Sequence, residues 1–587
     1  MIRLKHLHTY AGPNVYAVNP AIVVGLNTEP DDCVKAIDQF KLISRHFIRW
    51  SPAAFHGNAC DESGIGDYLV SLAQWLLNDV RGFIRTAKCI STSTGTLLVL
   101  GYHDPDLSML ALRIAVRMFE HIDGTHPEKL GKTVNQFSAL CRSRHPDYQA
   151  TILMQAAYNL DIPVLSLIHG TRFWQYGWGS RSRIFMESLS NADGSIASIL
   201  SENKLRSKAF FSSLGMPTPE SRLVSSVADL PAAITQIGYP CALKPLDCGG
   251  GKGVTANLRT HDQVARALKA ARQYSAGPLM LERFIQGEDH RLMAIDGQFM
   301  AAFRREPAHV VGDGARTIKQ LIHALNENRS INMISSQYFR PIAFDQIIED
   351  HLASQGIKPE DIPETGRRLS LRSNANLSTG GMAADVTAMV HPSLKAMVAQ
   401  MADSAGFGAA GFDYITTDIS QSPWESGGAF IEMNTTPGID IAVNAGWHVT
   451  DIGTRILGNA VGRIPIDLHV VKQMPESLGS ADAQIPARRF DAIVAGHELR
   501  VGEAVFRVED NSPWAAVKAA LRNKAIESLQ IVCALEDILS HGLPVDRIAR
   551  LTTDGVIIPA DWMSVLTDCS GEITDEWKFK QHHELPD

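Results

Sequence analysis

Three side chains with oxygen donors stand in two strand-like runs, in a pattern suited to binding a divalent cation. Glu432 and Asn434 lie two residues apart in the run 429–438, so in a strand their side chains share one face. Asp413 lies in a second strand-like run, 411–414, which could face them. Carboxylate and amide oxygens suit Mg²⁺ carried with nucleotide phosphates. The alternative interpretation is a hydrogen-bonded core carboxylate without a metal.

A glycine-rich loop with lysines on both sides is suited to binding a polyphosphate. The run 242–255 begins as an apolar strand that carries Lys244 and continues into a loop, whose relevant residues are Gly249, Gly250, Gly251, Lys252 and Gly253. Glycines let backbone amides approach phosphates, and lysine adds a point charge. The loop is not a P-loop, because Gly253 follows Lys252 where that motif has Ser or Thr. By itself, the run is equally typical of a flexible surface loop.

The run 279–293 is predicted to be two strands joined by a short link. Glu282 ends the first strand, whose backbone edge could bind adenine, and Asp289 follows where it could accept hydrogen bonds from ribose hydroxyls. The alternative is a salt-bridged surface patch on an edge strand.

In this order the motifs resemble the ATP-grasp ligases, over roughly residues 200–440. The resemblance implies that Lys208 and Lys244 hold the α- and β-phosphates and that the glycine loop covers them. It also implies two Mg²⁺ ions on the three oxygen-donor residues. Many members carry an arginine two residues before the metal aspartate. Here that position is Gly411, so charge at the transferred phosphate must come from elsewhere.

Longer strings resemble the cyanophycin synthetase family, over about residues 1–465. They comprise 3–14, 73–77, 81–85, 176–183, 305–314 and 371–381. The family implies phosphorylation of a carboxylate by ATP, followed by attack of an amine. For that chemistry the candidate catalytic residues are Arg305 at the acyl phosphate, Arg372 at the substrate carboxylate, and Arg291. The candidate substrate loop comprises Asn376, Ser378, Thr379, Gly380 and Gly381.

The family continues into a Mur-ligase-like domain with a Gly-Lys-Thr phosphate loop. No Gly-Lys-Thr or Gly-Lys-Ser follows residue 465, so we expect the second ligation of that family to be absent. The predicted function is an ATP-dependent carboxylate–amine ligase acting on amino-acid or peptide substrates. Two alternatives stay open: a dipeptide or natural-product amide ligase for small molecules, and a degenerate nucleotide-binding scaffold.

The elements that position these residues fall into three regions. Residues 1–160 are predicted to form an α+β domain, with strands at 21–26 and 94–101 and helices at 68–77 and 107–122. Residues 161–465 would form the ATP-grasp unit. Residues 466–587 would form a small mixed domain without assigned chemistry, with a strand or hairpin at 501–508 and helices at 513–522 and 535–541. The fold class is therefore multidomain, α/β and α+β.

Composition excludes several classes of protein. The 587 residues include 55 Lys and Arg against 63 Asp and Glu, and the net charge of −8 argues against a nucleic-acid partner. The 8 cysteines are scattered without a Cys-x-x-Cys pair, which argues against a disulfide framework or zinc site. The first residues lack the apolar core of a signal peptide, and no apolar run reaches the ~18 residues of a membrane span. We expect a cytoplasmic homo-oligomer, dimer or tetramer, without a membrane partner.

Overall fold

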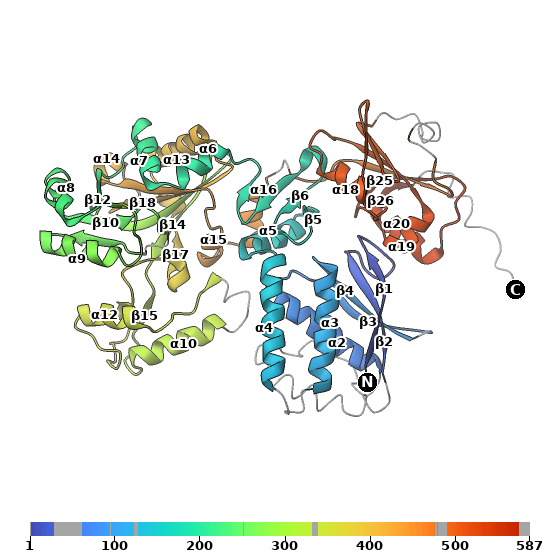
Figure 1. The fold of residues 1–587 in the computed structure, drawn as a ribbon, viewed down its shortest axis with the longest axis horizontal. Coiled ribbons are helices and arrows are strands. Elements are labelled where there is room, and N and C mark those ends of the chain that lie inside the picture. Colours follow the sequence, from blue (N-terminus) through green and yellow to red (C-terminus); the bar gives the residue numbers. More distant parts are fainter. Residues whose placement is uncertain are drawn as a thin grey trace. The chain divides into compact units, whose positions relative to one another are not determined.

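The computed structural model describes residues 2–28, 62–93, 95–121, 127–249, 252–330, 338–458, 461–475, 478 and 490–573. The chain divides into two units (Figure 1): unit 1 is Met1–Phe185 with Leu457–Asp587, and unit 2 is Met186–Ile456. Unit 1 thus contains the whole of the first and last predicted regions, together with both ends of the second. The predicted division into domains at residues 160 and 465 stays a prediction.

Strand β2 (Ala21–Asn27), at the predicted position, explains how two distant parts of the chain share unit 1. It lies in an antiparallel sheet of order β1-β2-β4-β3, with β1 Arg3–Tyr10, β3 Ala87–Thr92 and β4 Gly95–Gly101. Its side chains alternate between two cores. Ile22 and Val24 pack with helices α2 (Glu62–Asn78), α3 (Pro105–His121) and α4 (Pro127–Arg144). Ala21 and Val23 pack with residues of the carboxyl-terminal segment.

The carboxyl-terminal segment forms a seven-stranded sheet of order β23-β22-β21-β24-β20-β25-β26. The neighbours β21, β24, β20, β25 and β26 pair in parallel. At the other end of the sheet, β22 pairs antiparallel with both β21 and β23. The predicted strand or hairpin at 501–508 is the arm β22–β23. The bounds are β20 Ile466–Val471, β21 Ala492–Ala495, β22 Glu498–Val501, β23 Ala504–Arg507, α18 Ala515–Arg522, β24 Leu529–Ala534, α19 Leu535–His541, β25 Ile548–Thr553, α20 Ala560–Cys569 and β26 Ser570–Ile573.

The middle of unit 1 is a small antiparallel sheet. Asp147 caps helix α5 by accepting hydrogen bonds from the backbone N–H groups of Gln149 and Ala150. The bounds are α5 Tyr148–Asn159, β5 Val164–Ser166, β6 Trp174–Tyr176, η1 Gly179–Arg181 and β7 Arg183–Met186, which reaches the boundary of the unit. Strand β8, Leu189–Ser190, follows in unit 2.

Unit 2 contains two larger sheets and a small two-stranded sheet. The first sheet has the order β11-β10-β12-β9, and helices α8 and α9 contact it. The second has the order β17-β14-β13-β18-β19, and β15 pairs with β16. The strands are β9 Ser221–Val224, β10 Cys241–Pro245, β11 Thr255–Leu258, β12 Leu279–Arg283, β13 Glu288–Ile295, β14 Gln298–Glu306, β15 His309–Val311, β16 Arg368–Ser370, β17 Met382–Asp385, β18 Ala409–Thr416 and β19 Ala429–Asn434.

The helices of unit 2 cover these sheets. In the second sheet, aromatic side chains of β18 and β19 pack with Phe211 of helix α7. The α-helices are α6 Ser195–Ser201, α7 Lys204–Ser213, α8 Leu230–Ile237, α9 His261–Ala271, α10 Ile318–Ser330, α12 Gln346–Ser354, α13 Pro392–Ala405, α14 Pro423–Ser426, α15 Asp440–Asn444 and α16 Val449–Leu457; the 3₁₀ turns are η2 Val227–Asp229, η3 Leu377–Thr379 and η4 Thr387–Met389.

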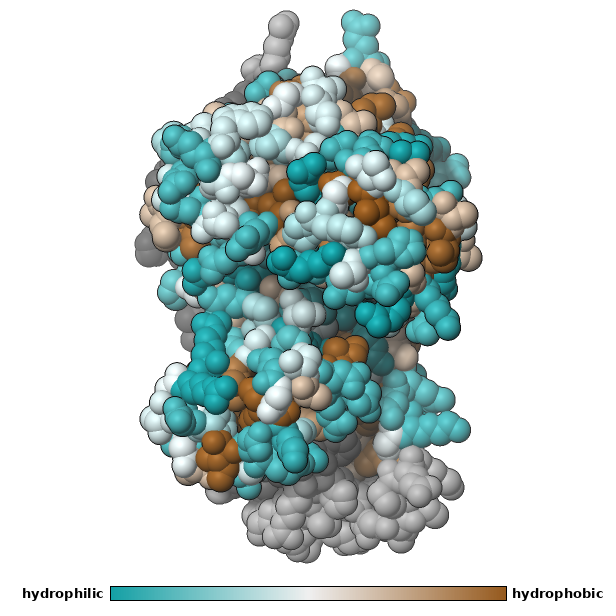
Figure 2. All heavy atoms as spheres, turned by 90° about the vertical axis from the view of Figure 1, so that its left-hand side faces the viewer, coloured by the Kyte–Doolittle hydropathy of each residue, from teal (hydrophilic) through white to brown (hydrophobic). Residues whose placement is uncertain are grey.

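Apolar side chains are scattered over the surface of unit 2 that Figure 2 shows. On the face of unit 2 in Figure 2, hydrophobic residues form small separate patches among hydrophilic ones. None of the helices in the described part of the chain is both long and apolar enough to span a bilayer.

Candidate functional site

One row of charged side chains crosses three neighbouring strands of unit 2. The pairing register places Arg291 of β13 opposite Asp413 of β18, and Asp413 opposite Glu432 of β19. Asn434 lies two residues beyond Glu432, opposite Gly411. The prediction that Asp413 faces the Glu432–Asn434 pair is confirmed, because strand pairing brings the two runs side by side.

Two arginines hold the two oxygens of Asp413. Arg291 NH1 lies 2.9 Å from Oδ1, and Arg305 NH2 lies 2.9 Å from Oδ2. Arg305 comes from β14, where it faces Asp289 of β13, and its NH2 lies 2.6 Å from Asp289 Oδ1. Arg291, Arg305, Asp289 and Asp413 thus form one largely buried charge network.

The carboxylates of this network have perturbed acidities. Burial acts to raise the pKa of Asp413, but the charges of Arg291 and Arg305 outweigh it and lower that pKa. Burial and then the charge of Asp413, its neighbour across the strands, raise the pKa of Glu432. Two neighbouring acids that are largely buried are suited to binding a divalent cation. The cation offsets the cost of burying their charges and the repulsion between them.

Gly411 leaves room for the Arg291 side chain. A Cβ at position 411 would lie 2.9 Å from Arg291 NH1 and 3.0 Å from Arg291 Cδ. The Arg291 guanidinium therefore occupies the space next to Gly411, which lies two positions before Asp413. Arg291, one of the three predicted site arginines, therefore reaches this position from the neighbouring strand β13. That it supplies charge at the transferred phosphate stays a prediction.

A second cluster lies on the sheet β11-β10-β12-β9. Glu282 Oε1 lies 2.7 Å from Lys244 Nζ, and Glu282 Oε2 lies 3.0 Å from Lys208 Nζ. Lys208 also donates a hydrogen bond to the carbonyl of Pro219 (2.9 Å). Burial lowers the pKa of Lys208 to about 8, although the charge of Glu282 opposes the shift. The structure thus brings three predicted ATP-binding residues together, with both ammonium groups bound to one carboxylate.

Lys204 is a cation at the site that the sequence analysis missed. It begins helix α7, which Asn203 caps by accepting from the N–H groups of Leu205 and Arg206. Its Nζ donates to the carbonyl of Cys248 (2.9 Å) and lies 3.8 Å from Glu432 Oε2. Lys204 thus bridges the start of the glycine loop and a metal-binding candidate. The available signal was its spacing, because Lys204 and Lys208 lie one helical turn apart.

The glycine loop is described in part. Gly250 and Gly251 lie outside the described residues. Gly253 has a φ of +71°, and a Cβ there would lie 2.9 Å from Pro245 Cγ, so this position favours glycine for two reasons. Lys252 is exposed, and its backbone N–H donates to the Gly249 carbonyl at 3.4 Å.

The Arg372 side chain interacts with residues just before helix α12. Its NH2 lies 2.6 Å from Asp345 Oδ2 and donates to the carbonyl of Ala343 (3.1 Å). Among the described residues, no ion pair joins it to Asp289, Asp413 or Glu432. Its predicted role at the substrate carboxylate stays a prediction.

The predicted substrate loop lies beside the strand that carries Arg305. It contains η3, and Gly380 follows with a φ of +90°. A Cβ on Gly381 would lie 2.9 Å from the carbonyl of Glu306, the residue after Arg305. The loop leads into β17, in which Ala383 faces Arg305. The Thr379 hydroxyl donates to Asn374 Oδ1 at 2.9 Å, and Ser378 is exposed. Asn376, which opens the loop, accepts the Gly381 N–H at its carbonyl.

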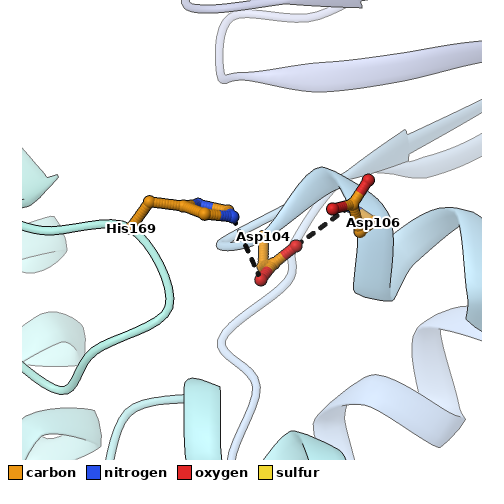
Figure 3. Close-up of side chains that lie close together, drawn as sticks. All are labelled: Asp104, Asp106 and His169. Carbon is orange, nitrogen blue, oxygen red and sulfur yellow. Dashed lines mark hydrogen bonds and ion pairs between the residues drawn. The ribbon is translucent and has the colours of Figure 1, made fainter.

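A separate acidic cluster in unit 1 is explained by helix capping. Figure 3 shows Asp104, Asp106 and His169 close together. Asp104 Oδ1 accepts the backbone N–H of Asp106 (3.0 Å) at the start of α3. Its Oδ2 lies 3.2 Å from Arg144 NH1 and 3.7 Å from His169 Nε2. Since the helix cap, Arg144 and His169 already use both Asp104 oxygens, we assign no ligand here.

Comparison with known proteins places these residues in context. Residues 203–295 match the family described as carbamoyl-phosphate synthase L chain, ATP binding domain. The chain is 31% identical to a cyanophycin synthetase of Trichormus variabilis over 369 residues, which are 62% of this chain and 40% of that protein. It is 28% identical to that of Geminocystis herdmanii over 481 residues, 79% of this chain and 54% of that protein. The chain thus spans about half the length, or less, of these relatives.

Further matches are to proteins of glutathione biosynthesis. The glutathione biosynthesis bifunctional protein GshAB of Desulfotalea psychrophila is 28% identical over 266 residues, 45% of this chain and 34% of that protein. Among solved structures, a bifunctional glutathione synthetase from Pasteurella multocida aligns with a TM-score of 0.42 and 16% identity, covering 76% of this chain and 82% of that one. The predicted resemblance to cyanophycin synthetases and the predicted ATP-grasp fold are confirmed.

Proposed function

We propose that this chain, an ATP-grasp protein that resembles cyanophycin synthetases, is an ATP-dependent carboxylate–amine ligase. It would join an amino acid to the carboxylate of an amino acid or peptide and release ADP and phosphate. The observation that carries the proposal is the row Arg291–Asp413–Glu432 with Arg305 beside it, in which two adjacent acids suited to metal binding lie next to two permanent cations. The proposal includes two Mg²⁺ ions as cofactors and the cytoplasm as the compartment.

The acids of the row fit the metal sites that this chemistry needs. Asp413, Glu432 and Asn434 would hold Mg²⁺, which neutralises charge on the phosphate oxygens when it is bound. Asp413 lies opposite Glu432 in the pairing of β18 and β19, and Asn434 lies two residues beyond Glu432 on the same strand. Since residues two apart in a strand share a face, the three side chains lie close together on the sheet.

The arginines of the row would stabilise the transferred phosphoryl group. Substrate carboxylate oxygen attacks the γ-phosphorus of ATP, the bond to the β,γ-bridging oxygen breaks, and ADP leaves. Arg291 and Arg305 are permanently charged and already lie within 2.9 Å of Asp413 oxygens. When phosphates arrive, these guanidiniums can pair with phosphoryl oxygens instead. The amine then attacks the acyl phosphate, phosphate leaves, and the nitrogen loses a proton.

The lysines would hold the rest of the nucleotide. Lys204 lies between Cys248 at the glycine loop and Glu432, which is a suitable position for contacting phosphates of the metal-bound nucleotide. Lys244 and Lys208 are held by Glu282, so a phosphate would compete with that carboxylate for them. Asp289 would face the ribose only if Arg305 releases it, since the two are paired at 2.6 Å.

The substrate loop would bind the carboxylate to be activated. It enters β17 beside Arg305, so an acid bound at 376–381 would lie near the phosphoryl-transfer residues. The side chains of this region select the acid. A product screen distinguishes a free amino acid, a peptide and a small natural product.

The test is an assay for nucleotide products with Mg²⁺ and a panel of amino acids and dipeptides, with product masses. We expect ADP and phosphate with a new amide. AMP and pyrophosphate would contradict the acyl-phosphate mechanism, and no turnover with any pair would favour the scaffold alternative. Glu432→Gln should abolish turnover through loss of the metal, and Glu425→Gln, an exposed helix-cap variant, should retain it.

A further inference from the structure

Asp440 is the first residue of helix α15, which follows strand β19 after a short turn. A Cβ on Gly438 in this turn would lie 3.2 Å from Asp440 Oδ1, so the carboxylate lies against the turn. A Cβ on Gly411 would lie 3.1 Å from Pro437 Cβ of the same turn and 2.9 Å from Arg291 NH1. The turn that leads to Asp440 therefore lies beside the Arg291 guanidinium.

The other end of α15 is fixed to the strand that follows the predicted substrate loop. The Asn444 side chain accepts the backbone N–H of Ala383 in β17 (2.7 Å) and donates to the carbonyl of Tyr338 (2.9 Å). Ala383 in turn lies opposite Arg305. Asp440 and Asn444 lie four residues apart, so they share one face of the helix. Asp440 therefore lies about one helical turn, ~6 Å along the axis, from the residue that holds β17.

Asp440 differs from the other acids of the site in its partners. Each of the others lies in an ion pair with an arginine or a lysine: Asp289, Asp413, Glu282 and Glu432. Within the residues that the structure describes, no ion pair involves Asp440, although its side chain is partly buried. Its negative charge is therefore available to a bound cation.

The groups that face Asp440 carry both signs of charge. Burial raises the pKa of Asp440 most, and the charge of Glu187 acts in the same direction. The charges of Arg340 and Arg291 oppose this shift in pKa without reversing it. Burial and then the charge of Asp440 raise the pKa of the Tyr338 phenol, which stays neutral at physiological pH. A carboxylate with a raised pKa is a better proton acceptor, as a general base must be.

We propose that Asp440 binds the ammonium group of the incoming amine and accepts one of its protons, a role that rests on the ligase function proposed above. The proton passes to an Asp440 carboxylate oxygen, and the nitrogen lone pair attacks the carbonyl carbon of the acyl phosphate. The bond from that carbon to the phosphate oxygen then breaks, and phosphate leaves with the second nitrogen proton. The amine substrate is therefore one that is protonated near neutral pH, such as the amino group of an amino acid or peptide.

Hydroxylamine separates this step from phosphorylation of the acid. It is mostly uncharged at neutral pH, so it attacks an acyl phosphate without a general base and gives a hydroxamate. The full chain receives Mg²⁺–ATP and the panel of acids, once with hydroxylamine and once with amino acids as the amine. Asp440→Asn should lower amide formation about 100-fold or more at neutral pH, while hydroxamate formation stays within about twofold of the wild type.

The pH dependence provides a second measurement. In Asp440→Asn the amine must lose its proton in solution, so amide formation should rise about tenfold per pH unit below the pKa of the amine. The wild type should rise less steeply. Asp440→Glu keeps a carboxylate and should retain part of the amide formation at neutral pH.

Asp451→Asn is the matched control, because Asp451 is an exposed acid of helix α16. It should leave both products unchanged. Equal loss of hydroxamate and amide in Asp440→Asn would show a structural role and overturn the inference, and so would unchanged amide formation. A wild-type chain that forms neither product with any acid would instead contradict the ligase function on which this role depends.

Discussion

Replacing Glu282 with glutamine tests whether one buried carboxylate holds two lysines in place. The carboxylate lies 2.7 Å from Lys244 Nζ and 3.0 Å from Lys208 Nζ, and the side chains of Glu282, Lys208 and Lys244 are 7%, 6% and 5% exposed. Removing one member of a buried ion pair costs about 3–5 kcal/mol. We expect Glu282→Gln to lower the free energy of unfolding of the sheet β11-β10-β12-β9 by about this amount near neutral pH.

The loss should shrink as pH rises. Lys208 has a pKa of about 8 in the folded protein against 10.5 in the unfolded chain, and without Glu282 the folded value falls further because that carboxylate acts to raise it. Between the folded and unfolded pKa values the unfolded state binds more protons, so stability rises with pH in this window. The window is wider for the variant. We therefore expect about 1–2 kcal/mol of the loss to disappear by about pH 9.5.

The assay must report on this sheet, because a chain with two units need not unfold in one step. A urea series at both pH values, sampled by short pulses of deuterium exchange in peptides of β10 and β12, provides that reading. Glu220→Gln is the matched control. Glu220 is about half-exposed and lies 3.8 Å from Arg283, so its loss should cost under about 1 kcal/mol. A Glu282→Gln variant as stable as this control, or equally destabilised at both pH values, would refute the reasoning.

Two further predictions concern the proposed phosphate site. Lys204→Ala should weaken binding of Mg²⁺–ADP about tenfold in calorimetric titration, because it removes a cation between the glycine loop and Glu432. Gly411→Ala should lower kcat about tenfold or more in the product assay while Mg²⁺–ADP affinity stays within about twofold, because its Cβ would lie 2.9 Å from Arg291 NH1 and displace that guanidinium from Asp413.

Matched controls separate these effects from general damage. Lys269→Ala removes an exposed lysine of α9 and should leave nucleotide affinity unchanged. Gly131→Ala adds a Cβ in helix α4 where nothing lies within 4 Å, and should leave kcat unchanged. Nucleotide affinity retained in Lys204→Ala would remove Lys204 from the site. An unchanged kcat in Gly411→Ala would show that Arg291 does not need its present position.

Local patterns predicted much of the site, because they depend on strand and helix geometry alone. The spacing of Glu432 and Asn434 fixes a common face in any strand, and Asp413 lies in the strand that faces them. The helix predicted at 535–541 is α19 at the same bounds. The apolar run at 21–26 is strand β2. Both faces of this strand are buried, so the residues on each face are apolar and the run is continuous.

Other features depended on contacts between distant segments. Lys204 and Lys208 are both lysines of one helix, one turn apart. Helix α7 nevertheless directs Lys208 into a buried ion pair with Glu282, whereas Lys204 points toward Glu432. Similarly, the motif around Arg372 does not reveal that its guanidinium pairs with Asp345 and with the backbone carbonyl of Ala343. Sequence spacing alone cannot distinguish these environments.

By itself, then, the sequence predicted which residues would carry the chemistry and determined which neighbours share a face, since the periods of strands and helices are local properties of the backbone. Only the tertiary structure decided which charges meet. Arg291 and Arg305 reach Asp413 from two other strands, and Ala21 and Val23 join a core with residues more than 400 positions away. Pairing between distant strands depends on the combined burial and register of both partners, which no single segment encodes.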